Sequence, residues 1–453
     1  MAFDTSLGTQ PIGKLLRQYA LPSIVAMTAS SVYNTMDSVF IGQGVGALAI
    51  AGLSVTFPLM NLAAAFGSLV GVGSGTLVSV KLGQKDYGTV QKVIGNTILL
   101  NVTIGLIFTV LTLTFLDNIL MFFGATEQTL PYAREYMQII LGGNIVTHLY
   151  LGLNSVLRSA GHPRESMTAT LNTVVINLIL DPLFIFGFHW GIRGAAIATV
   201  IAQLASLLWQ MRFFTSRETI LRLHFDKLRF DKKIVRNIIA IGMSPFLMNI
   251  ASCVIVILIN RNLLQYGGDM AVGAFGIVNR MTFFFCMGVM GLNQGMQPIA
   301  GYNYGAQQYD RVLKVLKITA IAATAVSTIA FLAGEFAPYY IARAFTADPD
   351  LIDISIVGLR INFLVFPCVG FQMVAGNFFQ SIGMAKKAIF LSLTRQVIYL
   401  IPMLIVFPHI WGLNGVWYSL PASDLLAFIT CTTLLIWQVK QFKKSPQNIK
   451  NDL

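Results

Sequence analysis

The sequence predicts an all-α membrane protein with twelve transmembrane helices in two six-helix bundles. Its 453 residues are 55% hydrophobic and only 11% charged, and the mean hydropathy is +0.69. A soluble domain carries about 25% charged residues, so this composition indicates an integral membrane protein. The second observation is that the two halves of the chain resemble each other in sequence, which predicts two bundles of the same architecture.

The internal repeat consists of short matching stretches that occur in the same order in each half. They pair Gly83–Tyr87 with Gly305–Tyr309, Ser159–Gly161 with Ser381–Gly383, and Trp190–Gly194 with Trp411–Gly415. An even number of spans in each half gives both halves the same orientation in the bilayer. The repeat therefore predicts a pseudo-twofold axis along the membrane normal, an arrangement typical of transporters.

Twelve apolar windows are long enough to cross a bilayer as helices, which requires about 20 residues each. They are residues 14–40, 50–80, 93–116, 132–156, 166–188 and 194–214 in the first half. In the second half they are residues 237–260, 271–302, 313–334, 354–380, 388–408 and 413–439. These runs lack the short alternating pattern of a transmembrane β-barrel.

The basic residues predict the orientation and the domain boundaries. Most of the 31 Lys and Arg residues fall on one side of the twelve-span arrangement, which places both termini in the cytoplasm. The net charge of +12 reflects this bias, so nucleic acid is not an expected partner. We expect an N-terminal lobe at 1–214, a basic cytoplasmic linker at 215–235, and a C-terminal lobe with a basic tail at 236–453.

Ionisable residues inside membrane spans are costly, and each is a candidate functional residue. Asp37 lies in the first span and Asp181 in the fifth. Asn177 precedes Asp181 by four residues and therefore shares its helix face. Thr199 lies about 9 Å from the outer end of the sixth span at 1.5 Å per residue. These four side chains are expected to converge in the outer half of the first lobe.

Such a cluster allows two kinds of coupling. Carboxylate, amide and hydroxyl oxygens suit Na⁺, whereas two neighbouring carboxyl groups in a low-dielectric site resist double ionisation and tend to hold a proton. Pro182 leaves the carbonyl of Leu178 without its helical donor, which adds a further possible ligand. Occupancy would bias bending of the first span at Pro22. The structural alternative is a polar network that only fixes helix packing.

The substrate cavity is less defined by the sequence. Methionine and phenylalanine residues crowd spans 7 and 8, and adaptable thioethers and aromatic rings suit bulky apolar cations. Ordinary core or lipid-facing packing explains any one of them equally well. The candidate cavity residues are Asn154, Met287, Met290, Asn293, Gln294 and Gln297. Arg395 and Asp424, on consecutive spans, are expected to form a structural ion pair.

The spans also resemble a known family. Six plus six spans, Pro22 early in the first, Asp37 ahead of Phe40-Ile-Gly42, and Gln297-Pro298 at the end of the eighth are similar to multidrug and toxic compound extrusion (MATE) transporters. The Asn177–Asp181 pair with Thr199 resembles the cation site of the DinF-like branch. The resemblance implies coupling-ion binding at Asp37, Asn177, Asp181 and Thr199, and bending at Pro22.

The chain departs from the NorM-type pattern in the second lobe. Spans 7 and 10 contain no Asp or Glu, and the repeat partners of Asp37 and Asp181 fall near Asn260 and Met403. A second-lobe sodium site is therefore not expected. Coupling is predicted in the first lobe alone.

The predicted function is a secondary antiporter that exports organic, often cationic, compounds in exchange for H⁺ or Na⁺, with no other cofactor or metal. No P-loop motif is present to indicate ATP use. The five histidines do not cluster and no H-E-x-x-H occurs, so no enzyme is predicted. The alternative is a lipid-linked oligosaccharide flippase, which would need a basic cavity. We expect a monomer in the bacterial inner membrane, with the lipid bilayer and small organic molecules as its partners.

Overall fold

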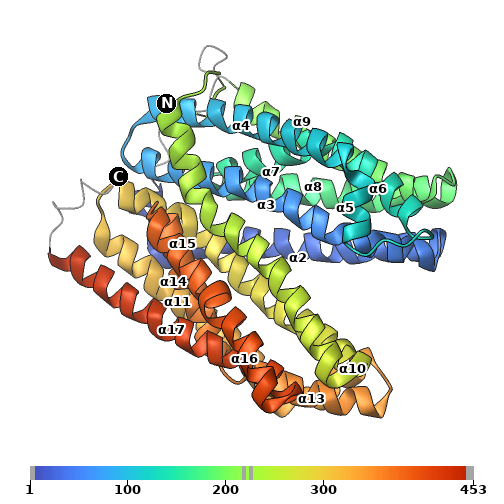
Figure 1. Cartoon of the computed structure of the whole chain (residues 1–453). Coiled ribbons are helices and arrows are strands. Elements are labelled where there is room, and N and C mark those ends of the chain that lie inside the picture. Colours follow the sequence, from blue (N-terminus) through green and yellow to red (C-terminus); the bar gives the residue numbers. More distant parts are fainter. Residues whose placement is uncertain (1–5, 217–220, 224–227, 445–453) are drawn as a thin grey trace. The chain divides into compact units, whose positions relative to one another are not determined.

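The computed structural model describes residues 6–216, 221–223 and 228–444, and the regular elements in these stretches are helices (Figure 1). The first half contains α1 (Ser6–Thr9), α2 (Ile12–Gly44), α3 (Ala47–Gly83), α4 (Tyr87–Thr114), α5 (Leu116–Phe122), α6 (Leu130–Gly142), α7 (Asn144–Ser159), α8 (Pro163–Pro182), the π-helical turn η1 (Leu183–Gly187) and α9 (Gly191–Thr215). The second contains α10 (Lys232–Gly305), α11 (Tyr309–Phe336), α12 (Pro338–Phe345), α13 (Pro349–Phe363), α14 (Phe366–Ser381), α15 (Ala385–Leu393), the π-helical segment η3 (Thr394–Leu400), α16 (Ile401–Trp411) and α17 (Leu413–Lys444).

The predicted twelve spans are confirmed by these helices. Within the described residues, 8 segments are each long and apolar enough to cross a membrane. Two further pairs pass the same test together but are bent, α6 with α7 by 55° and α13 with α14 by 50°. The 74-residue α10 is far longer than the roughly 20 residues that a bilayer requires. Counting α10 as two spans and including α2 gives the twelve predicted segments.

The division within α10 falls at Gly268. This residue has φ 67° and ψ −167°, a backbone conformation outside the helical region. Glycine adopts it without the steric penalty that a Cβ atom would bring. Gly268 lies between the windows 237–260 and 271–302, so the two predicted spans meet at this break.

Contacts within the chain define two compact units. The first contains residues Val25–Phe246, and the second contains Ser6–Ile24 and the chain from Leu247 onward. Both α2 and α10 therefore contribute one part to each unit. The predicted lobes at 1–214 and 236–453 describe the sequence repeat and stay a prediction, and part of the predicted linker (217–220 and 224–227) lies outside the described residues.

Close helix packing in the first unit depends on small residues. Figure 1 shows α3, α4, α7, α8 and α9 running alongside one another. A Cβ atom on Gly75 of α3 would lie 2.6 Å from Ser159 Oγ and 2.8 Å from Ser155 Oγ of α7. Small residues in membrane helices allow such close approach, where dispersion and polar contacts replace the hydrophobic effect. This packing holds α7 firmly against α3.

An aromatic cluster lies in the core of the second unit. Phe275, Phe363 and Trp417 are buried together where α10, α13 and α17 meet. The rings of Phe285 and Phe363 are 5.9 Å apart between centroids in an edge-to-face arrangement, which is a favoured aromatic geometry. A Cβ atom on Gly358 would lie 2.8 Å from the Trp417 ring, so the absence of a side chain there makes room for the indole.

Candidate functional site

A pair of carboxyl groups lies inside the first unit. Asp37 is on α2 and is 6% exposed, and Asp181 is on the last turn of α8 and is fully buried. The two carboxyl groups are close enough to interact electrostatically. Two negative charges at this separation repel strongly in a low-dielectric interior. A proton or a bound cation between them removes that repulsion.

Asn177 and Thr199 complete the predicted cluster. Asn177 Nδ2 donates to Asp181 Oδ1 at 3.2 Å, across one turn of α8. The same nitrogen lies 3.3 Å from Thr199 Oγ1 on α9. The structure therefore brings Asp37, Asn177, Asp181 and Thr199 together from three helices. This proximity agrees with the predicted convergence, and the coupling role of these residues stays a prediction.

Among the described residues, three oxygen atoms of the cluster have no hydrogen-bond donor. They are Asp37 Oδ1, Asn177 Oδ1 and Asp181 Oδ2, and all three are buried. Buried polar atoms in folded proteins are usually paired, and an unpaired one costs about 1–3 kcal/mol. These carboxylate and amide oxygens can accept a proton or act as ligands for a hard monovalent cation. Within the described residues, no three His, Cys, Asp or Glu side chains form a metal-binding group.

Two tyrosines belong to the site and were not predicted. The Tyr33 hydroxyl lies 3.3 Å from Thr199 Oγ1. Tyr136 on α6 is buried and interacts electrostatically with both Asp37 and Asp181. Tyr33 precedes Asp37 by four residues and shares its helix face, a spacing that the sequence displays. Tyr136 reaches the site only through the packing of α6, and no local pattern indicates this.

Pro22 and Asp37 share α2 but belong to different compact units. Pro22 lies within α2 in the segment that belongs to the second unit, whereas Asp37 belongs to the first. Fifteen residues separate them, about 22 Å along a helix. The site therefore does not include Pro22, and bending at this proline stays a prediction.

The predicted cavity residues lie in two separate places. Asn154 is buried on α7 and donates to Thr170 Oγ1 at 3.1 Å. The remaining candidates are on α10, where Asn293 Nδ2 lies 3.4 Å from the carbonyl oxygen of Met373. On the same helix, Gln297 is buried, and the partly exposed candidates are Met287, Met290 and Gln294. Their role in substrate binding stays a prediction.

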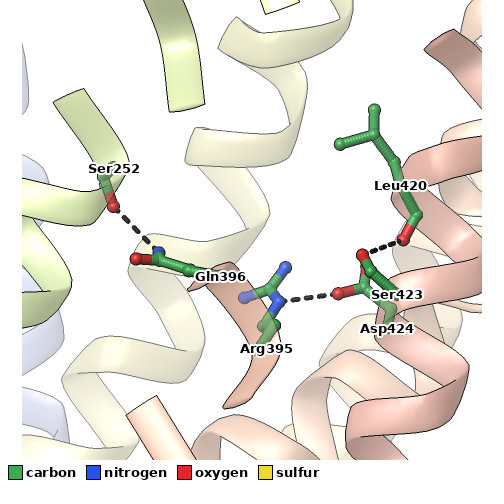
Figure 2. Close-up of polar contacts among 6 residues, drawn as sticks. All are labelled: Ser252, Arg395, Gln396, Leu420, Ser423 and Asp424. Carbon is green, nitrogen blue, oxygen red and sulfur yellow. Dashed lines mark hydrogen bonds and ion pairs between the residues drawn. The ribbon is translucent and has the colours of Figure 1, made fainter. Parts of the chain in front are cut away.

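The second unit contains the predicted ion pair. Arg395 Nε donates to Asp424 Oδ1 at 2.6 Å. Figure 2 shows Arg395 directed towards Asp424 on α17, while the adjacent Gln396 is directed towards Ser252. Arg395 and Gln396 both lie in η3, and as consecutive helical residues they project from different faces of this segment. The predicted contact is confirmed.

The two partners of this ion pair differ in burial, which predicts unequal effects of removing them. The side chain of Asp424 is 8% exposed and that of Arg395 is 33% exposed. Arg395→Met leaves a buried carboxyl group unpaired, which costs about 3–5 kcal/mol. Asp424→Asn leaves the less buried partner beside an amide oxygen that can still accept its hydrogen bond, so we expect a smaller loss. Thermal unfolding in detergent checks this order, and the double variant Arg395→Met/Asp424→Asn should recover part of the loss of Arg395→Met. Equal midpoints for the Arg395→Met and double variants would contradict it.

Comparison with known proteins shows the family. The sequence model of the MatE family matches residues 22–183 and 240–405, once in each half of the chain. The multidrug export protein MepA of Staphylococcus haemolyticus (strain JCSC1435) is 29% identical over 419 residues, which cover 92% of both chains. MepA of Staphylococcus aureus (strain MSSA476) is 27% identical over 425 residues, 94% of both chains.

Solved structures agree with this assignment. The MATE multidrug transporter DinF-BH, solved in complex with a small-molecule ligand, is 36% identical and has a TM-score of 0.90, covering 97% of this chain and 98% of its own. The crystal structure of a MATE point mutant superposes with a TM-score of 0.92 at 21% identity, covering 98% of this chain and 100% of its own, and so supports the fold. The family model and the MepA relatives match this sequence over most of its length, and the twelve-span architecture agrees with them. The protein therefore belongs to the MatE family of membrane transporters.

Proposed function

We propose that this protein is a secondary active multidrug efflux antiporter that exports organic, often cationic, compounds in exchange for H⁺ or Na⁺ by alternating access. The observation that carries the proposal is the buried Asp37–Asp181 pair with its unpaired oxygen atoms, inside a chain of the MatE family. Intramembrane carboxyl groups that lack basic partners are typical of proton and ion relays. The names of the MepA relatives and the ligand-bound structure of DinF-BH support drug-like substrates.

The coupling step follows from the chemistry of the site. When both carboxyl groups are ionised they repel, and a proton shared between them replaces repulsion with a hydrogen bond. A sodium ion would use the same oxygens together with the Thr199 hydroxyl. Either ion removes net negative charge where α2, α8 and α9 meet. The free energy of ion binding then differs between conformations, and this difference drives the transport cycle.

The proximity of the two carboxyl groups favours the proton as coupling ion. Asn177 donates to Asp181 Oδ1, while Asp37 Oδ1 and Asp181 Oδ2 have no hydrogen-bond partner among the described residues. One proton satisfies this arrangement with no change of geometry. Sodium would instead need several oxygen ligands arranged around it, including both carboxylates.

The Asp37 position on α2 connects the site to conformational change. α2 contributes Asp37 to the first unit and Pro22 to the second, so one helix belongs to both. A proline inside a helix removes one hydrogen bond and permits bending. Charge neutralisation at Asp37 would shift the equilibrium between straight and bent forms of α2. In this scheme the two lobes alternate access to a substrate cavity that includes the α10 side chains predicted above.

The experiment that tests this function measures dye retention in bacteria that lack their own efflux pumps. Cells that express the protein should accumulate less of a fluorescent organic cation than cells with empty vector. Proteoliposomes then identify the ion, because an imposed proton gradient should drive dye movement in sodium-free buffer. Export driven only by a sodium gradient would replace H⁺ with Na⁺ in the proposal. Equal dye accumulation with and without the protein would refute drug export and favour the lipid-flippase alternative.

A further inference from the structure

Polar side chains continue from the carboxyl pair along one face of α8. They recur at the spacing that keeps residues on a single helix face. In order they are Thr170, Thr173, Asn177 and Asp181. Measured along the helix, Thr170 lies about 16 Å from Asp181 at 1.5 Å per residue. The polar face therefore covers much of the length of a membrane span.

The two neighbouring helices carry matching polar faces with the same spacing. On α9 the residues are Thr199, Gln203, Ser206 and Gln210. On α7 they are Thr147, Tyr150, Asn154 and Arg158. We call these twelve residues the polar seam. All of them belong to the first compact unit.

Hydrogen bonds between helices show that the three faces meet. Thr173 Oγ1 donates to Ser206 Oγ at 2.7 Å, which joins α8 to α9. Asn154 Nδ2 donates to Thr170 Oγ1 at 3.1 Å, which joins α7 to α8. Thr147 hydrogen-bonds Gln203, which joins α7 to α9. With the Asn177–Thr199 contact at 3.3 Å, polar contacts between the helices recur at successive levels from the carboxyl pair to Thr170.

Helix packing alone does not account for the seam, because several of its buried atoms have no hydrogen-bond partner among the residues that the structure describes. Gln210 is 0% exposed and both its amide oxygen and its amide nitrogen are unpaired. Asn154 Oδ1 and Arg158 Nε are also buried without partners. An inter-helix hydrogen bond in a membrane adds little to stability. Orphaned donors and acceptors oppose that small gain, and buried polar groups without protein partners ordinarily bond to water.

The seam ends at the side of the lobe that carries the basic residues. Arg158 lies in the last turn of α7, Arg164 in the first turn of α8 and Arg212 in the last turn of α9. The excess of Lys and Arg predicts that this side faces the cytoplasm. Arg158 and Gln210 therefore lie near the cytoplasmic end of the seam, and the carboxyl pair lies at its other end.

From this arrangement we infer that the polar seam is a hydrated path that connects the Asp37–Asp181 site with the cytoplasm inside the first lobe. Its hydroxyl and amide groups carry water and a proton or small monovalent cation. The inference rests on the proposed function, because it supplies the cytoplasmic exit of the coupling ion. The ion then leaves through the lobe itself and does not share the substrate cavity.

Cysteine accessibility to Ag⁺ tests the path directly. Ag⁺ is a small monovalent cation that reacts with thiols exposed to water. Cys253, Cys286, Cys368 and Cys431 all lie in the second unit and can be replaced first to give a cysteine-free background. In that background, Ser206→Cys places a thiol in the seam. Its matched control is Leu208→Cys, two residues further along α9, where the side chain is 63% exposed on the outer face.

The readout is protection of the thiol from a fluorescent maleimide that is added after denaturation. Ag⁺ applied to inside-out membrane vesicles should abolish later labelling of Ser206→Cys and leave Leu208→Cys labelled. Labelling of Ser206→Cys that persists after Ag⁺ treatment would overturn the inference and identify the seam as dry packing. Protection only in right-side-out vesicles would also overturn it, since the site would then open to the opposite side. Neither result depends on dye export. The thiol-protection assay therefore tests the path, while the dye-retention assay tests the proposed function separately.

A matched pair of threonines gives a second measurement. Thr173 and Thr168 both lie on α8, and each hydroxyl bonds the carbonyl four residues earlier. Only the Thr173 hydroxyl is also within hydrogen-bonding distance of a side chain on α9, at 2.7 Å from Ser206 Oγ. Thr173→Val keeps the side-chain shape and should slow proton-gradient-driven export several-fold in proteoliposomes, whereas Thr168→Val should leave the rate unchanged. Equal rates for both variants and the wild type would contradict a path through the Thr173–Ser206 contact.

Discussion

Asp181→Asn is expected to abolish export, so that dye accumulation rises to the level of cells with empty vector. The amide has nearly the same size as the carboxyl group and still accepts a hydrogen bond from Asn177, which donates to Asp181 at 3.2 Å in the native site. It cannot bind or release a proton at physiological pH and carries no charge to attract a cation. The ion-binding step is therefore lost while the packing of α8 against α9 is retained.

The control for this variant is Asp117→Asn. Asp117 pairs with Arg134 at 2.6 Å at the surface of the same unit, and its side chain is 49% exposed. Exposed ion pairs contribute about 0–1 kcal/mol, so this substitution should leave both expression and export unchanged. Export by Asp181→Asn at the wild-type level would mean that the buried cluster only fixes helix packing. An Asp181→Asn protein that fails to accumulate in the membrane would call for the same test with Asp37→Asn.

Gly242→Ala is expected to prevent stable folding of the first unit. A Cβ atom at Gly242 on α10 would lie 1.8 Å from the carbonyl oxygen of Leu69 on α3 and 2.6 Å from its carbonyl carbon. Gly73 forms the reciprocal contact, with its Cβ position 2.0 Å from the carbonyl oxygen of Ile238. Because both obstacles are backbone atoms, no side chain can rotate away. The helices would have to separate, at a cost of about 4 kcal/mol or more.

Gly276→Ala is the matched control, since it makes the same substitution in the same helix. Gly276 has no atom within 4 Å of its Cβ position. Alanine there should be neutral or stabilising by about 1 kcal/mol, because glycine is the poorer helix former. Size-exclusion profiles and thermal unfolding in detergent distinguish the two variants. A monodisperse Gly242→Ala protein with an unchanged unfolding midpoint would show that the contact between α3 and α10 adjusts freely.

Local sequence patterns predicted part of the candidate site. Asn177 and Asp181 are one helical turn apart, so their common face follows from helix geometry alone. Asp37 and Thr199 were predicted to join them because ionisable and polar groups inside a membrane must face the protein interior. Tyr33 has the same one-turn relation to Asp37, but its phenol is neutral at physiological pH and so lacks the cost of a buried charge that marks Asp37 in the sequence.

Other features depend on how distant segments pack. Tyr136 on α6 lies close enough to the carboxyl pair to interact electrostatically with it, and nothing in its neighbourhood in the sequence differs from an ordinary interior position. The polar seam likewise consists of residues that look ordinary on each helix alone. It becomes apparent only when Thr173 is seen to bond Ser206 and Asn154 to bond Thr170.

The sequence by itself determined the class of the protein, its twelve spans and its internal repeat. These features depend on composition and on the length of apolar runs, which the bilayer thickness sets without reference to other segments. Only the tertiary structure showed that α2 and α10 are each divided between the two compact units. It also showed that the contact with Leu69 leaves no room for a side chain at Gly242, and which buried polar atoms of the described residues are unpaired. Those features arise from contacts between residues far apart in the chain, and such contacts are fixed by packing in three dimensions rather than by local pattern.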